Sequence, residues 1–385
     1  MTILGDVGGD GRFAPDASAY SRTESVSLFI CVLRPRENQN FETALLYQAQ
    51  RRIRYTFIVM KPTFHHRLVN GPFEDPCVFV RMLRERRAFL FDAGDISRLE
   101  AGDLQKITDL FITHTHIDHF IGFDTLLRAL LRRETPLRVY GPENIVDCVG
   151  GKLRGYTWNL IEQYPIKMEV FAVGGREIRH TSFYAENGFR GIERASRPFD
   201  GVVLKDAPYT VRAATLTHDT PCLGFALEED FHINIDKAAL NDLGLPVGPW
   251  LGELKRVIRE KAAPDTPLMA GGREFMFSDL VHLAGITEGQ KVSYVTDVSP
   301  EEENLRKIGE LVRNSDTLYC EAYFLDEDRE RARERHHLTA KLAGTIARKA
   351  EVKDLVVVHC SPKYRDLPGV IEKEAMEEFR RTTES

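Results

Sequence analysis

Three histidines and an aspartate lie within six residues of this 385-residue chain, at His114, His116, Asp118 and His119. They directly follow the apolar run 110–112. Neutral imidazole is a good ligand for zinc and similar metals, and a carboxylate offsets part of the ion's charge. Alternate residues of an extended segment point to one side, so His114 and His116 can bind one ion, while Asp118 and His119 reach a second where the chain turns. This spacing predicts a metal site rather than four ordinary hydrogen-bonded side chains.

Three further residues could complete a two-metal site because each directly follows a strand-like run. They are His218 after 211–217, Asp297 after 292–296 and His359 after 355–358. A rigid sheet commonly presents functional side chains where its strands end. Taken singly, each of these residues is more typical of a capped turn, and it is their combination with the first cluster that suggests a shared site.

The elements that must position these residues follow from short β-type runs and longer amphipathic stretches. Strands are predicted at 64–69, 77–83, 88–91, 110–113, 137–140, 209–217, 224–228, 291–296, 317–320 and 355–359, and helices at 122–131, 301–314 and 339–350. Strands that come first and then alternate with helices predict a layered α/β architecture with sheet in the middle. No strand or helix is predicted in the charged stretch 172–207.

Composition excludes several classes of protein. The chain is 43% apolar and 29% charged, which is typical of a globular protein. Its six cysteines form no Cys-x-x-Cys pair, so a disulfide framework or a zinc finger is not expected. The net charge of −6 gives no general case for nucleic-acid binding. No run approaches the length of a membrane span, and no signal peptide is evident, so a cytoplasmic protein without membrane contact is expected.

Several motifs, in the same order along residues 64–366, resemble the metallo-β-lactamase superfamily and its ribonuclease Z (tRNA 3′-processing) branch. The His-x-His-x-Asp-His cluster carries the resemblance to the superfamily. The branch is indicated by four further segments, at 217–225 (Thr-His-Asp-Thr-Pro-Cys-Leu-Gly-Phe), 320–324 (Cys-Glu-Ala-Tyr-Phe), 337–339 (His-Leu-Thr) and 359–364 (His-Cys-Ser-Pro-Lys-Tyr). In the branch, the second and third of these segments read His-Glu-Ala-Thr-Phe and His-Ser-Thr, so Cys320, Tyr323 and Leu338 depart from them.

The resemblance implies a four-layer αβ/βα sandwich with two zinc ions at one edge of two facing sheets, Mn²⁺ or Fe being the alternatives. By position it assigns His114, His116 and His218 to one ion, Asp118, His119 and His359 to the other, and Asp297 to both. It also implies that a metal-bridging hydroxide attacks phosphorus and that Asp118 orients it.

The resemblance further implies that His337, oriented by Glu321, protonates the leaving 3′ oxygen. His337 is equally consistent with a structural role at the start of a helix. His336 is adjacent, and only the His-x-Thr register favours His337 as the acid.

Three functions are compatible with these features. The first is a phosphodiesterase that removes 3′ trailers from precursor tRNA. The second is a hydrolase of a small phosphodiester, a cyclic nucleotide or another ester. The third is a non-catalytic metal- or RNA-binding module, which the presence of all seven ligand positions disfavours. A homodimer is expected.

The domain organisation is expected to be a hydrolase domain over 61–385, preceded by an extension at 1–60 that is either mobile or non-native, with Met60 as an alternative start. An arm is expected at about 237–273, where Gly and Pro residues at 244–249 exclude one continuous helix. If the arm binds tRNA, Lys255, Arg256 and Arg259 are the expected phosphate contacts. Nearby acidic residues offset much of their charge, which favours a small substrate.

Overall fold

The computed structural model describes residues 63–83, 85–367 and 369–381. The predicted N-terminal extension, residues 1–60, lies outside the described residues. None of the helices in the described ranges has the length and apolar character needed to cross a bilayer. The five cysteines within these ranges are all free thiols.

The first sheet contains eight strands whose spatial order is also their order in the chain. Its middle strands β3 to β6 run parallel to one another, and the outer strands pair antiparallel. The strands are β1 (Phe64–Leu68), β2 (Val78–Met82), β3 (Ala88–Phe91), β4 (Ile107–Phe111), β5 (Leu137–Pro142), β6 (Lys167–Val173), β7 (Glu177–Tyr184) and β8 (Ile192–Pro198).

The second sheet contains six strands, of which β16, β17 and β18 are parallel and the others antiparallel. In spatial order they are β18 (Asp354–Val358), β17 (Thr317–Glu321), β16 (Lys291–Val295), β11 (Pro221–Glu229), β10 (Tyr209–Thr217) and β9 (Val202–Asp206). The carboxyl ends of parallel strands meet at one edge of a sheet, so β16, β17 and β18 deliver the residues that follow them to the same edge.

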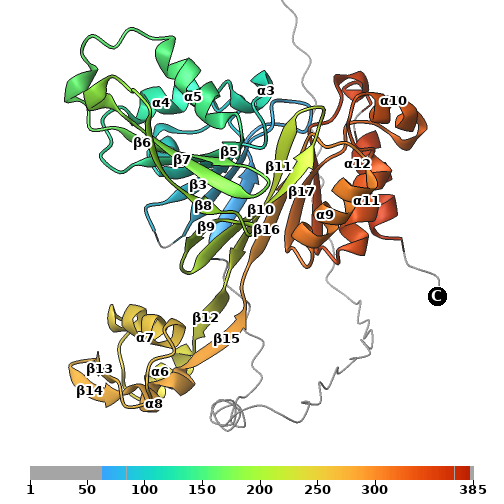
Figure 1. The fold of residues 1–385 in the computed structure, drawn as a ribbon. Coiled ribbons are helices and arrows are strands. Elements are labelled where there is room, and N and C mark those ends of the chain that lie inside the picture. The colour runs from blue at the N-terminus through green and yellow to red at the C-terminus, as the bar shows by residue number, and fades with distance from the viewer. Residues whose placement is uncertain (1–62, 84, 368, 382–385) are drawn as a thin grey trace, which may run out of the picture. The chain divides into compact units, whose positions relative to one another are not determined.

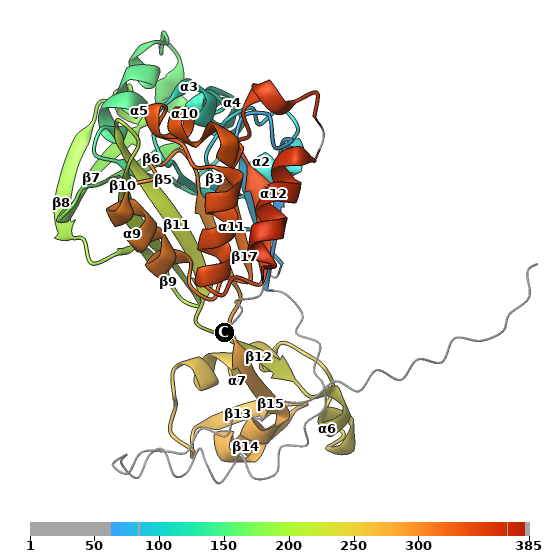
Figure 2. The same cartoon turned by 90° about the vertical axis from the view of Figure 1, so that its right-hand side faces the viewer.

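Apolar side chains from the two sheets form one buried cluster between them. Helices cover both outer faces (Figure 1). Helices α2 (Ala101–Leu104), α4 (Phe123–Leu130) and α5 (Ile145–Arg154) pack on the first sheet, while α9 (Glu302–Val312), α11 (Ala340–Lys349) and α12 (Val370–Phe379) pack on the second. Figure 2 shows this second helical layer in front of its strands. The predicted αβ/βα sandwich is therefore confirmed.

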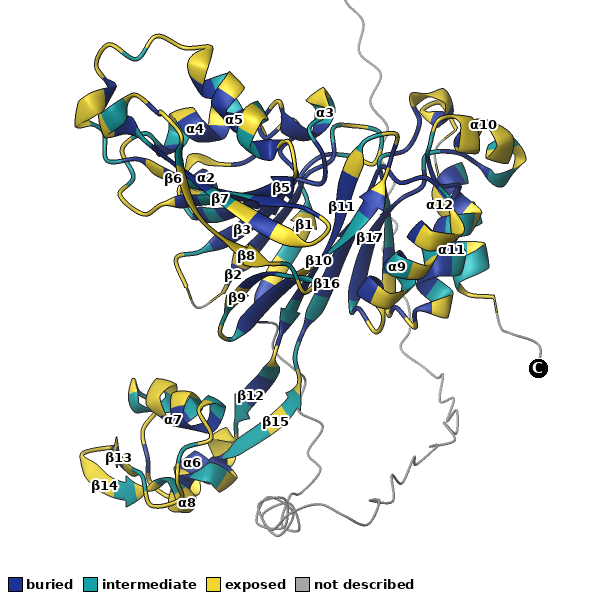
Figure 3. Cartoon of the chain, viewed as in Figure 1, coloured by how far each residue is buried: buried dark blue, intermediate teal, exposed yellow. Residues whose placement is uncertain are grey.

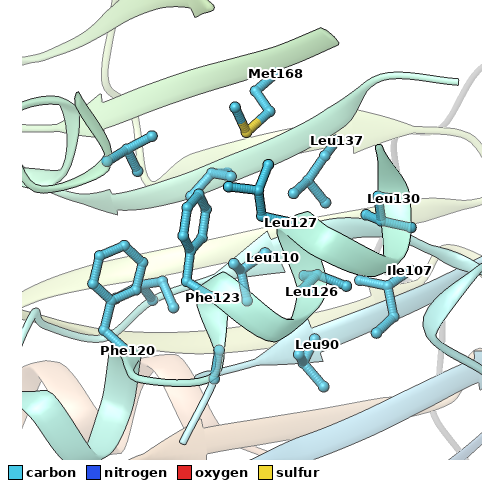
Figure 4. Close-up of a cluster of buried hydrophobic side chains, with 14 of the residues drawn as sticks. Leu90, Ile107, Leu110, Phe120, Phe123, Leu126, Leu127, Leu130, Leu137 and Met168 are labelled. Carbon is cyan, nitrogen blue, oxygen red and sulfur yellow. The ribbon is translucent and has the colours of Figure 1, made fainter. Parts of the chain in front are cut away.

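The layers form because the sequence supplies apolar faces with the right period. In α4 the buried residues are Phe123, Leu126, Leu127 and Leu130, the i, i+3, i+4, i+7 spacing of one helix face. They pack against Leu110 and other side chains of the first sheet (Figure 4). This packing fixes the segment that follows β4, and that segment carries the histidine cluster.

Residues 231–288 leave the second sheet between β11 and β16 and form a smaller unit with its own apolar cluster, called the arm below (Figure 3). Its strands pair as β12 with β15 and β13 with β14. The elements are β12 (Phe231–Ile235), α6 (Lys237–Asp242), α7 (Trp250–Arg259), β13 (Pro267–Ala270), β14 (Arg273–Met276), α8 (Phe277–Leu280) and β15 (Ala284–Glu288). The Gly and Pro residues at 244–249 separate α6 from α7, and no continuous helix runs through them.

The strands and helices that were predicted agree with the structure to within a few residues. The sequence predicted no element for α5, β6, α12 or the strands of the arm, and none in the stretch 172–207. There the structure forms β7, β8 and β9. Strand β8 is an edge strand that is exposed along most of its length. An exposed edge strand needs no apolar side, which explains why its sequence shows no alternation.

Candidate functional site

Seven predicted ligands lie together at the edge of the two sheets. His114 and His116 follow β4, and His116 directly precedes the short helix α3 (Ile117–Phe120), which carries Asp118 and His119. His218 and His359 directly follow β10 and β18, respectively. Asp297 follows β16 with one residue between them. Segments far apart in the sequence are thus brought to one place by the order of the strands.

The seven side chains form two groups that share no residue. His114, His116, His218 and Asp297 each offer one ligand atom within 4.8 Å of the others, and Asp118, His119 and His359 do the same. In the second group Asp118 Oδ2 lies 3.5 Å from His119 Nε2 and 3.3 Å from His359 Nε2.

Asp297 lies between the groups and directs one carboxylate oxygen to each. Its Oδ2 is 3.5 Å from His114 Nε2 and 3.4 Å from His218 Nε2. Its Oδ1 is 3.6 Å from His119 Nε2 and 2.6 Å from His359 Nδ1. This is the arrangement expected of a carboxylate that bridges two cations.

The donor atoms fit metal ions better than they fit one another. His114 Nε2 and His119 Nε2 are buried, and they have no hydrogen-bond partner among the described residues. Ligands about 2.0–2.1 Å from a tetrahedral zinc ion are roughly 3.3 Å apart, close to most of the separations above. Because an unpartnered buried polar atom is costly, a bound cation gives these nitrogens the partner they lack.

Asp92 orients His119 of the second group through the ring nitrogen that faces away from the site. Its carboxylate accepts hydrogen bonds from His119 Nδ1 at 2.8 Å, from the backbone N–H of Thr113 at 2.7 Å and from the Tyr294 hydroxyl at 2.8 Å. In the first group the backbone carbonyl of His336 accepts from His218 Nδ1 at 2.7 Å. Both contacts leave Nε2 free to face the site, as in many metal-binding histidines.

Sequence reasoning missed Asp92, although a signal was present. It directly follows the buried strand β3, as His359 follows β18. Asp92, Asp297 and His359 also share left-handed backbone conformations, with φ of 54°, 50° and 50°. Such values are uncommon for residues with a side chain and tend to occur at functional sites.

The site concentrates negative charge around its imidazoles. Burial lowers the pKa of His114 to about 2, and the neighbouring His119 adds to this effect. Burial would also lower the pKa of His119, but Asp297 and Asp92 outweigh it and raise the pKa to about 10. Burial would raise the pKa of Asp297, yet His359 and His119 keep it well below its ordinary range. Asp297 therefore stays ionised, which favours a cation.

Glu321 contacts His337 and is itself fully buried. His337 Nδ1 donates to Glu321 Oε2 at 2.8 Å, and Glu321 Oε1 accepts from the backbone N–H groups of Val298 and Leu338. His336 instead pairs with Ser299, whose hydroxyl lies 2.8 Å from its Nδ1. The two histidines therefore differ in surroundings: His337 is buried and pairs with a carboxylate, whereas His336 is partly buried and pairs with a hydroxyl.

Among known proteins, the ribonuclease Z of Treponema pallidum (strain Nichols) is 30% identical to this chain over 294 residues, which cover 74% of this chain and 82% of the relative. The chain belongs to the ribonuclease Z family. The ribonuclease Z of Deinococcus radiodurans is 29% identical over 281 residues, covering 72% of this chain and 83% of the relative. No family model matches the chain. As a ribonuclease Z family member the chain is a metal-dependent hydrolase, as predicted.

Two solved structures resemble this ribonuclease Z family member. A metallo-β-lactamase fold protein from Bacillus subtilis has a TM-score of 0.49 and 15% identity, covering 83% of this chain and 94% of that one. The short form of human tRNase Z has a TM-score of 0.46 and 18% identity, covering 78% of this chain and 93% of that one. The family assignment rests on the sequence relatives.

In the arm of this ribonuclease Z family member, the three cations named as phosphate contacts of a tRNA-binding arm all contact acceptors of the chain itself. Arg256 pairs with Glu253 and Glu260 on α7. Lys255 Nζ donates to the Ile233 carbonyl at 2.7 Å, and Arg259 donates to the Phe231 carbonyl at 3.1 Å. Arg259 also lies 3.6 Å from Glu229 of β11. All three side chains thus have acceptors in the chain itself, and their role as phosphate contacts stays a prediction.

Proposed function

We propose that this protein is a dinuclear zinc phosphodiesterase that removes 3′ trailers from precursor tRNA. The first ion is held by His114, His116 and His218, the second by Asp118, His119 and His359, and Asp297 binds both. The observation that carries the proposal is the placement of the two Asp297 oxygens, each within 3.6 Å of imidazole nitrogens of a different group. The relatives are named ribonuclease Z, and this name supports RNA as the class of substrate.

Two divalent ions held by these residues would supply an acidified water and would stabilise negative charge on the oxygens of the reacting phosphate. The remaining roles belong to the side chains. Asp118 is only partly buried and its Oδ2 lies among the ligands, so it is suited to orient a water molecule. Glu321 keeps a proton on His337 Nδ1, which leaves Nε2 to deliver a proton to the departing 3′ oxygen.

The test is a side-by-side assay of the purified protein, with elemental analysis of the same preparation. About two zinc ions per chain and cleavage of a 3′-extended precursor tRNA at its 3′ trailer are expected. Bis-p-nitrophenyl phosphate provides the comparison substrate. Hydrolysis of this ester without cleavage of precursor tRNA would contradict the tRNA substrate while leaving the metal site intact. Manganese or iron in place of zinc would change only the metal.

A second candidate, hydrolysis of a small phosphodiester, is favoured by one observation. The arm cations Lys255, Arg256 and Arg259 already contact groups of the arm. A surface that binds RNA through its phosphates needs positive charge that is not offset by its own chain. The expected homodimer, cytoplasmic location and division into residues 1–60 and 61–385 remain predictions.

A further inference from the structure

The Tyr323 side chain lies flat against His337. Their ring centroids are 3.9 Å apart and their planes differ by 6°. Strand β17 ends at Glu321, and Tyr323 lies two residues further along the chain. The family motif has threonine at this position, so the stack is a feature of this chain rather than of the motif.

The backbone on both sides of this stack is fixed. The Tyr323 N–H donates to the Leu338 carbonyl at 3.1 Å, and its carbonyl accepts from the Ser361 N–H at 3.0 Å. The next residue, Phe324, forms a β-bridge with Thr339. The tyrosine ring therefore starts from an anchored main chain and presents a rigid flat surface.

His337 needs such a surface because one hydrogen bond does not fix a ring. Glu321 Oε2 holds Nδ1 at 2.8 Å, but the imidazole can still pivot about that contact. The torsion that turns a histidine ring is broad and has no sharp minimum of its own. A parallel ring at van der Waals distance restricts this rotation, and together the two contacts determine where Nε2 points.

We propose that Tyr323 is a positioning residue that fixes the plane of His337 and so aims Nε2 at the leaving oxygen. The catalytic consequence of this inference rests on the proposed function, whereas the orientation of the His337 ring does not. Tyr323 acts through its aromatic face, so its hydroxyl is not required.

The kinetic test compares Tyr323→Ala with Tyr323→Phe on two substrates. The 3′ oxygen of RNA leaves as an alcohol and needs a proton, whereas p-nitrophenolate leaves as a stable anion. In Tyr323→Ala, kcat on precursor tRNA should fall about 2- to 13-fold, the factor that corresponds to an ordinary aromatic stack. Its KM, its metal content and its turnover of bis-p-nitrophenyl phosphate should stay unchanged. Tyr323→Phe should match the unmodified protein on both substrates.

Several results would overturn the proposal. Equal losses on both substrates would indicate damage to the site as a whole, and a change confined to KM would indicate that Tyr323 contacts the substrate. A phenylalanine variant as slow as the alanine variant would assign the role to the hydroxyl.

A crystal structure of Tyr323→Ala separates this inference from the proposed function. The His337 ring should adopt new or multiple orientations, while Glu321 stays in place. A ring that keeps its orientation would refute the positioning role whatever the enzyme cleaves. Failure of the unmodified protein to cleave precursor tRNA would instead refute the proposed substrate, and the ring orientation would still decide the role of Tyr323.

Discussion

Asparagine in place of Asp297 should remove one of the two ions and leave the other. The substitution keeps the size of the side chain and one oxygen, but the amide nitrogen that replaces the second oxygen carries two hydrogens and is not a ligand for divalent metals. In the structure Oδ2 lies near His114 and His218, whereas Oδ1 lies near His119 and His359. An asparagine can therefore serve only one of the groups.

The expected metal content of Asp297→Asn is about one ion per chain instead of two. Hydrolysis of bis-p-nitrophenyl phosphate should fall by about 10²- to 10³-fold, the usual cost of losing one preorganised electrostatic contact at a reacting group. The variant should also lose stabilisation by added metal. A ligand at 100 times its Kd contributes about 2.7 kcal/mol to the free energy of unfolding, so the thermal shift with zinc should shrink measurably.

The metal content is measured by elemental analysis after dialysis. The stabilisation by metal is measured by thermal unfolding with and without zinc. Asp109→Asn is the matched control, because Asp109 is equally buried but pairs with Arg87 and Arg138 away from the ligands. The control should be less stable and still bind two ions. If Asp297→Asn also binds two ions and shows the full thermal shift, the bridging role is wrong.

Four other outcomes are expected. His337→Ala should lower kcat on precursor tRNA by about 10²- to 10⁴-fold with unchanged metal content; a larger loss in His336→Ala would move the acid to that residue. Tyr294→Phe removes a buried hydrogen bond to a carboxylate and should lower the free energy of unfolding by about 1–3 kcal/mol in urea titrations. Arg256→Ala should leave the salt dependence of precursor-tRNA binding unchanged, because this side chain already pairs with two glutamates; a slope reduced by about one would refute this. Deleting residues 1–59 should leave metal content and Tm nearly unchanged, and a much lower Tm would show that this segment supports the fold.

Much of the candidate site was accessible from the sequence because its signals are local. A histidine or carboxylate directly after an apolar strand lies at the edge of the sheet, as His218 and His359 illustrate. The same reasoning would have selected Asp92 had the strand ending at Phe91 been treated like the others. Its partner Tyr294, 202 residues away, could be found only from the way the two sheets face each other.

In the arm, contacts between residues close in the sequence could be predicted, and contacts between distant residues could not. Glu253, Arg256 and Glu260 are spaced three and four residues apart, so their pairing on a helix was readable from the sequence. The contacts of Lys255 and Arg259 were not, since their acceptor carbonyls lie 22 and 28 residues earlier in the chain. The Tyr323 stack on His337 likewise depends on the bridge between two separate segments.

The left-handed backbone at Asp92, Asp297 and His359 limits how far this protein can be stabilised without losing its site. Each such conformation costs on the order of 1–3 kcal/mol for a residue with a side chain. Glycine would adopt these angles without that cost, but it would remove the carboxylate or the imidazole. At Asp92 the three hydrogen bonds that the carboxylate accepts offset this cost, so glycine there would lose more than it gains. The backbone strain is therefore kept in place by the same side chains that build the site.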